Sequence, residues 1–468
     1  MAANHIINLL KMKKPKKKII FYLILLSFLS IKIFHILNQK GVSWDSAVYI
    51  EMGKSIFSLG KMGLWEPARP LILPIFLGFL WQLRLNPVIF GRIMELIFSL
   101  CCIYLIYLIG EDIFNEDIAL LSAFFLAFSP TFLFYSSTIL TGIPSTFFAL
   151  LAIYFLIKTE YFLAGLFIGL SFMIRFLQFF ILIPIVFALF LYKKNQLKRV
   201  VSLVYGFLIV VIPYLILNIF LYKNPIYPFL LQVFMTKYTG WVFHEKLSFY
   251  FINLFKENFL VLFVIIGVIF ILKKRDYKKT TILSIFLLFF VFFNLMTHKE
   301  MRFILVFLPY IYLVMSYGIF ESFSLIKKKK GLFYLAIMFI GIIWLTQNIN
   351  QIRIPVYKEY PEFISYLEMD NVKDGIWINN PIFIVNSNKK ADELIYYPLY
   401  NSKKIDGLKE RLTEAKHVLI NTCDILPCPE DDKDCTKNTI NLINHLKENF
   451  KTIHYKKEDN CEQFIFSR

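Results

Sequence analysis

The sequence is poor in charged residues. Only 18% of its 468 residues are Asp, Glu, Lys or Arg, whereas a typical soluble domain carries about 25%. Hydrophobic residues make up 57%, above the usual range of about 45–50%, and long apolar runs recur along the chain. This composition excludes a water-soluble fold and predicts a polytopic α-helical membrane protein.

The sequence also lacks the motifs of several common mechanisms. It contains no glycine-rich nucleotide loop, no Walker motif, no zinc-binding helix and no sustained heptad pattern. We therefore expect no mechanism driven by cytosolic ATP. Any energy that is needed comes from a lipid-borne activated donor or from an ion gradient.

Negative charge is scarce in the first three quarters of the chain. Residues 1–349 hold 34 Lys or Arg against 14 Asp or Glu, whereas residues 350–468 hold 17 against 19. The formal charge of +18 therefore lies in short clusters between apolar runs, as in polytopic membrane proteins. We expect membrane lipids as partners and no nucleic acid.

Eleven apolar runs predict membrane spans, since about 20 apolar residues cross the hydrocarbon. The first follows a lysine-rich segment and has no small-residue cleavage site, so we interpret it as an uncleaved span rather than a signal peptide. The runs are 19–37, 88–109, 118–135, 145–158, 161–174, 176–192, 200–221, 259–272, 281–297, 303–320 and 331–348.

Residues 70–87 are apolar too, but two prolines, a glycine and Arg84 interrupt them. If they do not cross, the basic clusters at 11–18, 193–199, 273–279 and 327–330 all face the cytoplasm. If they cross, three of these clusters face outside, against the positive-inside rule. We therefore predict a re-entrant or interfacial helix at 70–87, a multi-pass protein of the cell membrane with a cytoplasmic N-terminus, and an external loop 38–87 and tail.

The tail, residues 350–468, predicts a small external α/β domain after a transmembrane module of residues 1–349. Helical patterns (359–369, 405–415, 438–450) alternate in it with strand-like runs (376–385, 417–422, 462–466). It contains Cys423, Cys428, Cys435 and Cys461, for which we expect disulfides in an oxidising exterior. A zinc site is the alternative, although the Cys-x4-Cys-x6-Cys spacing lacks the usual close pair. The sequence leaves three pairings open.

The first external loop carries the most distinctive polar residues. Asp45 precedes an apolar helical pattern over residues 46–60, where an N-cap carboxylate would belong. A helix cap is therefore the simplest interpretation of Asp45. The same loop also holds two tryptophans, Arg69 and an interfacial helix, which together are typical of a lid over a site at the membrane surface.

Charged residues also lie at the ends of other predicted spans. Residues 297–303 place His298, Lys299, Glu300 and Arg302 within five positions on the external side, and these four groups cannot all face lipid. Lys and Arg at a membrane surface suit a phosphate, although a loop that anchors two span ends is the alternative. Arg175, which lies between two apolar runs, is explained equally well as a snorkelling anchor at a span end and as a functional residue. Arg92 and Glu95, three positions apart, are expected to neutralise each other.

Together these features resemble the GT-C superfamily of membrane glycosyltransferases, in particular the dolichyl-phosphate-mannose protein mannosyltransferases and the aminoarabinose transferases. The resemblance covers most of residues 38–350. It rests on Asp45 with Tyr49, Gly60 and Arg69-Pro70, on 129–144, 165–175 and 224–228, and on His298-Lys299-Glu300-x-Arg302-Phe303 with Pro309. Where relatives often carry further acidic residues, this chain has Ser46 and Thr141-Gly142.

The resemblance implies an inverting transfer of one sugar from a polyprenyl (dolichyl) phosphate to a hydroxyl of a lipid, glycan or protein acceptor, on the external face. Asp45 would be the general base. The donor phosphate would be bound by Arg175, Lys299 and Arg302. Tyr49, Arg69, His298 and Glu300 would bind substrate, and the sequence leaves open whether a divalent cation takes part. A transporter or flippase of lipid-linked saccharides is the alternative function, and a catalytically inactive receptor is a third.

Overall fold

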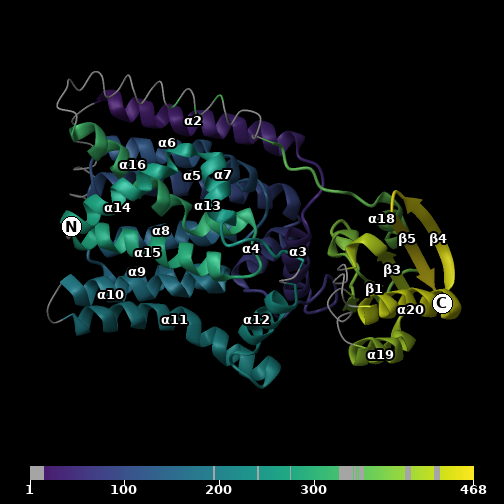
Figure 1. Cartoon of the computed structure of the whole chain (residues 1–468). Helices are drawn as coiled ribbons and strands as arrows, with labels where there is room; N and C mark the ends of the chain where they lie inside the picture. Colours follow the sequence, from purple (N-terminus) through teal and green to yellow (C-terminus); the bar gives the residue numbers. More distant parts are fainter. Residues whose placement is uncertain are drawn as a thin grey trace.

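The computed structural model describes residues 15–192, 196–239, 242–274, 276–325, 353–395, 402–425 and 433–468, together with residues 341, 344 and 346. Figure 1 shows two parts, a bundle of helices and a smaller part with a β-sheet at one end of that bundle. The predicted combination of a helical membrane part with a small C-terminal sheet is confirmed. The boundary at residue 350 and the external position of the tail stay predictions.

The bundle is built from apolar helices whose bounds follow the predicted runs. Four of them, α2, α5, α11 and α15, are long and apolar enough to cross a membrane. The run 331–348 lies almost wholly outside the described residues, so the number of eleven spans stays a prediction. The bundle helices are α2 (Pro15–Asn38), α5 (Pro87–Ile113), α6 (Glu116–Phe128), α8 (Gly142–Ile157), α9 (Tyr161–Ile174), α10 (Leu182–Tyr192), α11 (Leu197–Tyr222), α14 (Phe263–Lys274), α15 (Tyr277–Leu295) and α16 (Leu308–Leu325).

Local sequence signals set several of these boundaries. Asn86 caps α5 by accepting hydrogen bonds from two backbone amides, and Pro87 occupies the first helical position. The predicted run 118–135 is divided at Ser129 and Pro130 into α6 and the short helix α7 (Pro130–Tyr135), because Pro130 has no N–H to continue the hydrogen bonding of α6. The run 176–192 begins as a 3-10 helix, η1 (Phe176–Ile181), before α10.

Small residues let α9 and α11 approach closely. A Cβ at Gly165 would lie 1.9 Å from the carbonyl oxygen of Leu203, and a Cβ at Gly206 would lie 2.2 Å from that of Phe162. Neither position can therefore accept a side chain without separating the two helices. Such close backbone contact through glycine is typical of helix pairs in membranes, where packing replaces the hydrophobic effect as the driving force.

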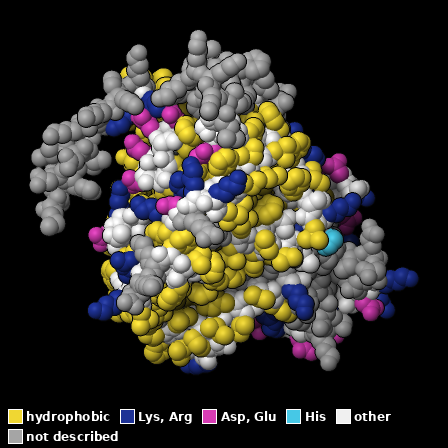
Figure 2. Space-filling view, turned by 60° about the vertical axis from the view of Figure 1, so that its left-hand side comes forward, with side chains coloured by type: hydrophobic (Ala, Val, Ile, Leu, Met, Phe, Trp, Pro, Cys, Tyr) yellow, Lys and Arg dark blue, Asp and Glu magenta, His cyan; other side chains and the backbone are white. Residues whose placement is uncertain are grey.

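Hydrophobic side chains cover much of the bundle's outer surface. Figure 2 shows them as a broad yellow face, with Lys and Arg mostly toward its margins. They include Leu23 and Phe34 of α2, Phe187 of α10, Phe220 of α11 and Ile265 of α14, each at least 46% exposed. A soluble protein does not expose so large an apolar face, so this surface is the one that contacts lipid.

The loop between α2 and α5 forms a helical hairpin. Its helices are α3 (Trp44–Phe57) and α4 (Ile72–Gln82), which cross at Gly53 and Gly78. With eleven residues, α4 is about 16 Å long and too short to cross the hydrocarbon, in keeping with the prediction for 70–87. Residues 46–54 of α3 are all buried, because the bundle lies on one side of α3 and the C-terminal part on the other.

The C-terminal part is a five-stranded mixed sheet in the order β2-β1-β3-β5-β4. The strands β2, β1 and β3 are parallel, and β5 is antiparallel to both β3 and β4. Side chains of alternate residues form two cores, one with α19 and α20 and the other with α18 and α3. The elements are α18 (Pro361–Leu367), β1 (Ile376–Ile378), β2 (Glu393–Leu394), α19 (Ser402–Arg411), β3 (His417–Asn421), α20 (Lys433–Asn449), β4 (Lys451–Glu458) and β5 (Cys461–Ser467).

The structure corrects some predictions for the tail. Only the first residues of the run 376–385 form a strand, because Asn380 and Pro381 start a 3-10 helix there. The edge strand β4 was not predicted, since its mostly exposed residues carry no alternating apolar pattern. A disulfide joins Cys423 to Cys461. Cys428 lies outside the described residues, and nothing is described of the Cys435 side chain.

Candidate active site

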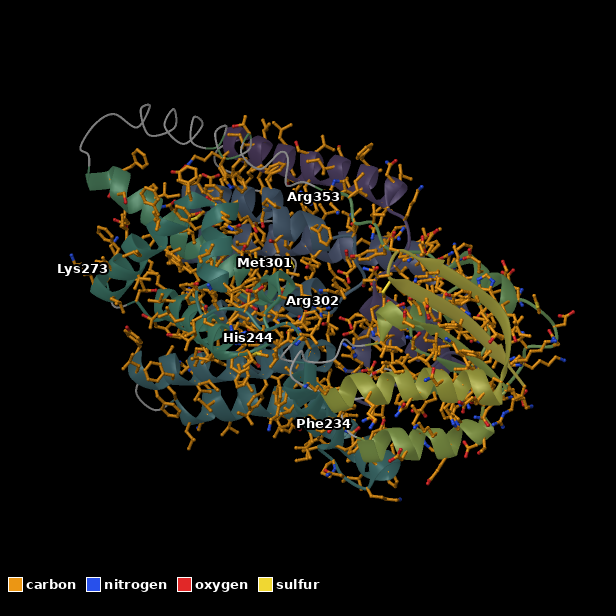
Figure 3. All side chains as sticks on the ribbon, turned by 45° about the vertical axis from the view of Figure 1, so that its right-hand side comes forward. Phe234, His244, Lys273, Met301, Arg302 and Arg353 are labelled. Carbon is orange, nitrogen blue, oxygen red and sulfur yellow. A yellow bond between two sulfur atoms is a disulfide. The ribbon has the colours of Figure 1, made fainter. Side chains whose placement is uncertain are left out.

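A cavity of about 610 Å³ lies where the bundle meets the C-terminal part. Its walls come from α3, the loop before α8, the break between α9 and η1, and η3 (Met301–Val306), with residues 423–425 on the tail side. Figure 3 shows Arg302 on the side of the bundle nearer the sheet. Seven of the eight predicted catalytic and binding residues line this cavity: Asp45, Tyr49, Arg69, Arg175, His298, Glu300 and Arg302.

Ser43, and not Asp45, caps α3. Ser43 has extended backbone angles, and its Oγ accepts a hydrogen bond from the backbone N–H of Ser46 at 3.3 Å. Asp45 is the second residue of the helix, so its interpretation as the N-cap is wrong. The Asp45 side chain is therefore available for contacts outside the helix.

Both carboxylate oxygens of Asp45 bind arginines. Oδ1 lies 2.8 Å from a terminal nitrogen of Arg69, and Oδ2 accepts a hydrogen bond from a terminal nitrogen of Arg302. Burial by itself raises the pKa of the Asp45 carboxyl, but the two guanidinium groups outweigh burial and lower this pKa well below its usual value. Asp45 is therefore a carboxylate at any physiological pH.

Arg302 connects Asp45 to a second acid. Its other terminal nitrogen donates to Glu300 Oε1 at 2.6 Å, and the same oxygen lies 2.7 Å from Nε2 of His298. Burial raises the pKa of Glu300, yet His298 and Arg302 lower it further, so the net shift is downward. The ring of Phe243 stacks on the imidazole of His298 with the ring centroids 4.4 Å apart. These contacts fix the direction in which Arg302 points.

Arg175 occupies the break between α9 and η1, where its extended backbone ends one helix before the next begins. Its guanidinium lies 3.5 Å from the Thr141 hydroxyl and over the ring of Phe303. Burial and the charge of Arg302 lower the pKa of Arg175 to about 10. Among the described residues, no carboxylate forms an ion pair with it. Arg175 is thus a partly buried cation that an anion would stabilise.

Arg69 is held by residues on both sides of it. Its Nε donates to Glu66 Oε1 at 3.2 Å, and its guanidinium lies 5.6 Å from the centroid of the Tyr49 ring. Tyr49 is one helical turn after Asp45, so both side chains lie on the same face of α3. Tyr49 and Glu66 therefore hold Arg69 against Asp45.

Lys299 does not line the cavity. Its Nζ donates to the backbone carbonyls of Glu245 and Met296, at 2.9 and 2.5 Å. The side chain is buried and ties the 296–300 segment to the loop that contains Glu245. This placement gives Lys299 a role in the loop's structure and leaves Arg175 and Arg302 as those of the three predicted phosphate-binding cations that line the cavity.

The predicted neutralisation of Arg92 by Glu95 is wrong. Arg92 donates instead to the backbone carbonyls of Gln39 and Gly41, just before α3. Glu95 accepts a hydrogen bond from the backbone N–H of Leu140 at 3.0 Å. The two side chains thus fix two separate loops, one leading to Asp45 and one to Thr141, at the edge of the cavity.

Two further polar residues of the cavity come from the tail and were not predicted. The Tyr357 hydroxyl lies 3.2 Å from that of Thr138. Oδ2 of Asp424 accepts hydrogen bonds from Tyr360, Asn380 and Asn421 at 2.8–2.9 Å. Sequence spacing gave no signal for either residue, because only the folded sheet brings them to the cavity.

The residues of the cavity do not fit a divalent cation. Asp45 and Glu300 already bind guanidinium groups, whose positive charge disfavours a metal ion at the same oxygens. Over the described ranges, no group of three or more His, Cys, Asp or Glu side chains is arranged to hold a metal. We therefore derive no step of the reaction through a metal ion.

Solved structures of two other proteins share this fold. ArnT from Cupriavidus metallidurans bound to undecaprenyl phosphate superposes with a TM-score of 0.65 at 8% identity, over 95% of this chain and 97% of that one. The Archaeoglobus fulgidus oligosaccharyltransferase AglB, in complex with an inhibitory peptide and a dolichol-phosphate, gives 0.61 at 12% identity, over 87% of this chain and 70% of that one. At these identities the likeness shows the fold alone.

The sequence itself carries a family signature. No curated protein matches it, but residues 67–384 match the model of the Alg9-like mannosyltransferase family. That match spans more than half of the chain and includes Arg69, Arg175 and the 298–302 segment. The chain therefore belongs to the Alg9-like mannosyltransferase family and is a membrane glycosyltransferase of the GT-C superfamily, as its sequence motifs predict.

Proposed function

We propose that this enzyme transfers one sugar, with inversion at the anomeric carbon, from a polyprenyl-phosphate donor to an acceptor hydroxyl on the external face of the membrane. The observation that carries the proposal is that Asp45 lines the same cavity as Arg175, a cation with no carboxylate partner among the described residues. A carboxylate and an unpaired cation in one cavity match the two charge changes of the reaction, loss of a proton and departure of a phosphate.

Asp45 is the proposed general base. The acceptor oxygen attacks the anomeric carbon while the bond from that carbon to the phosphate oxygen breaks. The proton of the acceptor hydroxyl passes to the Asp45 carboxylate, and the bonding electrons leave with the polyprenyl phosphate, which gains one negative charge. A base at hydrogen-bond distance typically contributes about 10²–10⁴-fold.

Arg175 and Arg302 are proposed to bind the donor phosphate and to stabilise the charge that develops on it. Arg175 has no carboxylate partner among the described residues, and a phosphate placed between the two guanidinium groups would relieve their mutual repulsion. Tyr49, Arg69, His298 and Glu300 are proposed as substrate-binding residues that also orient these groups.

The donor is also proposed to free the base. Without substrate, Asp45 is a weak base because two guanidinium groups hold its oxygens. The phosphodiester monoanion of the donor, placed near Arg302, would compete with Asp45 for the same nitrogens. Its negative charge raises the pKa of Asp45. We therefore expect the donor to bind before the acceptor can be deprotonated.

The proposed orientation places the cavity on the external side. Figure 3 shows Lys273 at the end of the bundle remote from the sheet and Arg302 nearer to the sheet. Lys17, Lys158 and Lys274 form ion pairs with acidic residues near the ends of α6, α5 and α16. A basic end that faces the cytoplasm agrees with the positive-inside rule and would leave residues 350–468 outside as a separate domain.

Reconstitution tests the proposal directly. Purified protein in proteoliposomes is given radiolabelled polyprenyl-phosphate sugars together with a panel of lipid, glycan and peptide acceptors. We expect a labelled, alkali-stable acceptor and the release of polyprenyl phosphate, both lost in Asp45→Asn. Movement of the labelled donor between leaflets without transfer would instead support the alternative function, a transporter or flippase.

A further inference from the structure

A second cavity, of about 550 Å³, lies between the turn that joins α4 to α5 and residues 385–388 of the tail. Its lining contains several amide side chains, which can form hydrogen bonds with uncharged groups, and no carboxylate. The residues that matter for its chemistry are Trp81, Gln82, Arg84, Asn86, Asn386 and Asn388.

This cavity is separate from the candidate active site. Lys54, which contributes to its wall, follows Asp45 by nine positions, or two and a half helical turns. The two residues therefore lie on opposite faces of α3, and the hairpin of α3 and α4 stands between the cavities. No residue lines both of them.

Lys54 of α3 fixes the tail segment that forms one wall of the second cavity. Lys54 Nζ donates to the carbonyls of Val385 and Ser387, at 2.7 and 2.8 Å, and lies 2.8 Å from Glu51. These three contacts use its hydrogen-bonding capacity, so Lys54 is a structural strut and not a ligand. Gly63 holds the same segment further on, through the backbone of Lys389 and Ala391.

This anchoring directs two amides outward. Val385 and Ser387 are buried, whereas the alternate residues Asn386 and Asn388 are exposed on the opposite side of the segment. Asn388 Oδ1 accepts a hydrogen bond from Trp81 Nε1 at 3.3 Å, and its amide nitrogen makes no hydrogen bond within the described chain. The Asn386 side chain makes none there either. Among the described residues, the Asn386 side chain and the amide nitrogen of Asn388 are thus presented without partners.

The opposite wall supplies an aromatic face and one cation. Trp81 is half-buried near the end of α4, and Arg84 is exposed with no ion pair among the described residues. Arg84 has a φ of 61°, a left-handed conformation in which glycine normally ends a helix. Arg84 thus lies directly after α4 and contributes its side chain to the wall of the cavity.

We propose that this second cavity binds a saccharide unit. A sugar ring presents an apolar C–H face, which suits the indole of Trp81, and several hydroxyls that both donate and accept hydrogen bonds, which suit amides and one guanidinium. The absence of carboxylates from the lining admits neutral and acidic sugars alike. The saccharide would belong to the acceptor or product glycan, at a part remote from the reacting hydroxyl. Only this origin of the saccharide rests on the proposed function.

Binding measured without transfer tests this site. The full-length protein in nanodiscs is examined by saturation-transfer NMR with methyl glycosides of common neutral and acidic hexoses and their disaccharides. We expect binding by the wild-type protein, and roughly tenfold weaker binding by Trp81→Ala and by the double variant Asn386→Ala/Asn388→Ala. Trp81→Phe, which keeps an aromatic face, should retain most of the affinity and controls for folding. Asn449→Ala, an exposed amide on α20, should bind like the wild type.

Two outcomes would overturn the proposal. One is equal binding by the wild type and all these variants, or binding by none of them. The other is unchanged saccharide binding by Trp81→Ala together with a lower yield of membrane-inserted protein, which would make Trp81 an interfacial anchor. The variant Asp45→Asn separates this test from the proposed function, because it should abolish transfer and leave saccharide binding at the second cavity unchanged.

Discussion

Arg302 binds the carboxylate of Asp45, a residue 257 positions earlier in the chain. The same guanidinium holds Glu300, and Arg69 holds the other oxygen of Asp45. One cation thus joins the loop between α2 and α5 to the segment that precedes α16. Without substrate, both oxygens of Asp45 are paired with guanidinium groups. An anion must compete with Asp45 for these groups before its carboxylate can accept a proton.

Asp45→Asn should give a folded protein with a transfer rate lower by about 10²–10⁴-fold, because the amide cannot accept the acceptor's proton. Ser43→Ala is the matched comparison. Ser43 is the actual cap of α3, so its loss should cost about 1 kcal/mol of stability with a smaller change in rate. Steady-state transfer and thermal unfolding of both variants measure the contrast. Near-normal turnover by Asp45→Asn would leave the mechanism without its base.

Arg175→Ala and Arg302→Ala should each lower kcat/KM for the donor by roughly 10- to 100-fold, as expected for the loss of a charge-assisted hydrogen bond. Lys299→Met is the control, because Lys299 binds backbone carbonyls and does not face the cavity. It should lower the unfolding temperature while the donor KM changes little. An equal effect of all three changes on the donor KM would restore Lys299 to the phosphate site.

Stability should depend on pH through Glu51. Burial raises the pKa of its carboxyl from 4.5 to about 7, despite the neighbouring Lys54. The folded state therefore keeps a proton that the unfolded state loses above pH 4.5. The contribution of Glu51 to stability is complete below that pH and is lost as the pH rises through about 7. The unfolding temperature of Glu51→Gln minus that of the wild type should therefore increase as the pH is raised from 4.5 to 8. A constant difference would contradict this assignment.

Replacing both Cys423 and Cys461 by Ser should destabilise the tail by about 4 kcal/mol, the loop-closure value for their sequence separation of 38. Thermal unfolding with and without reductant measures this change. Mass spectrometry of non-reduced peptides identifies the bond. Cys428→Ser is the control and should leave the 423–461 peptide pair intact. Recovery of Cys423 and Cys461 as free thiols from an oxidising exterior would refute the pairing.

Single cysteines should report the orientation of the chain. Lys273 and Lys390 are exposed on the bundle and on the tail, respectively. In intact cells, a membrane-impermeant thiol reagent should label Lys390→Cys but not Lys273→Cys, and the wild type gives the background. Labelling of both variants from outside would reject the topology derived from the basic clusters.

The sequence predicted the bundle and most of the cavity because each relies on a local signal. The run 161–174 coincides with α9. Arg175, His298, Glu300 and Arg302 were recognisable as charged groups at the ends of spans, and Asp45, Tyr49 and Arg69 were identified in the loop 38–87 through the family resemblance. Contacts between distant residues were not predictable. The pairing of Arg92 with carbonyls near Gly41, and the arrival of Tyr357 and Asp424 at the cavity, depend on how the tail folds against α3.

The burial of α3 determines the order in which the parts of this enzyme complete their folding. Val48 and Met52 share a core with Phe363 and Ile378, so the helix that carries Asp45 completes its packing only when the sheet has formed. Ribosomes make α3 some 300 residues before that sheet, and the unfinished chain meets the membrane with its base on an incompletely packed hairpin. We therefore expect nascent and C-terminally truncated chains to be inactive. Catalysis then begins only once the last strand has reached its final place.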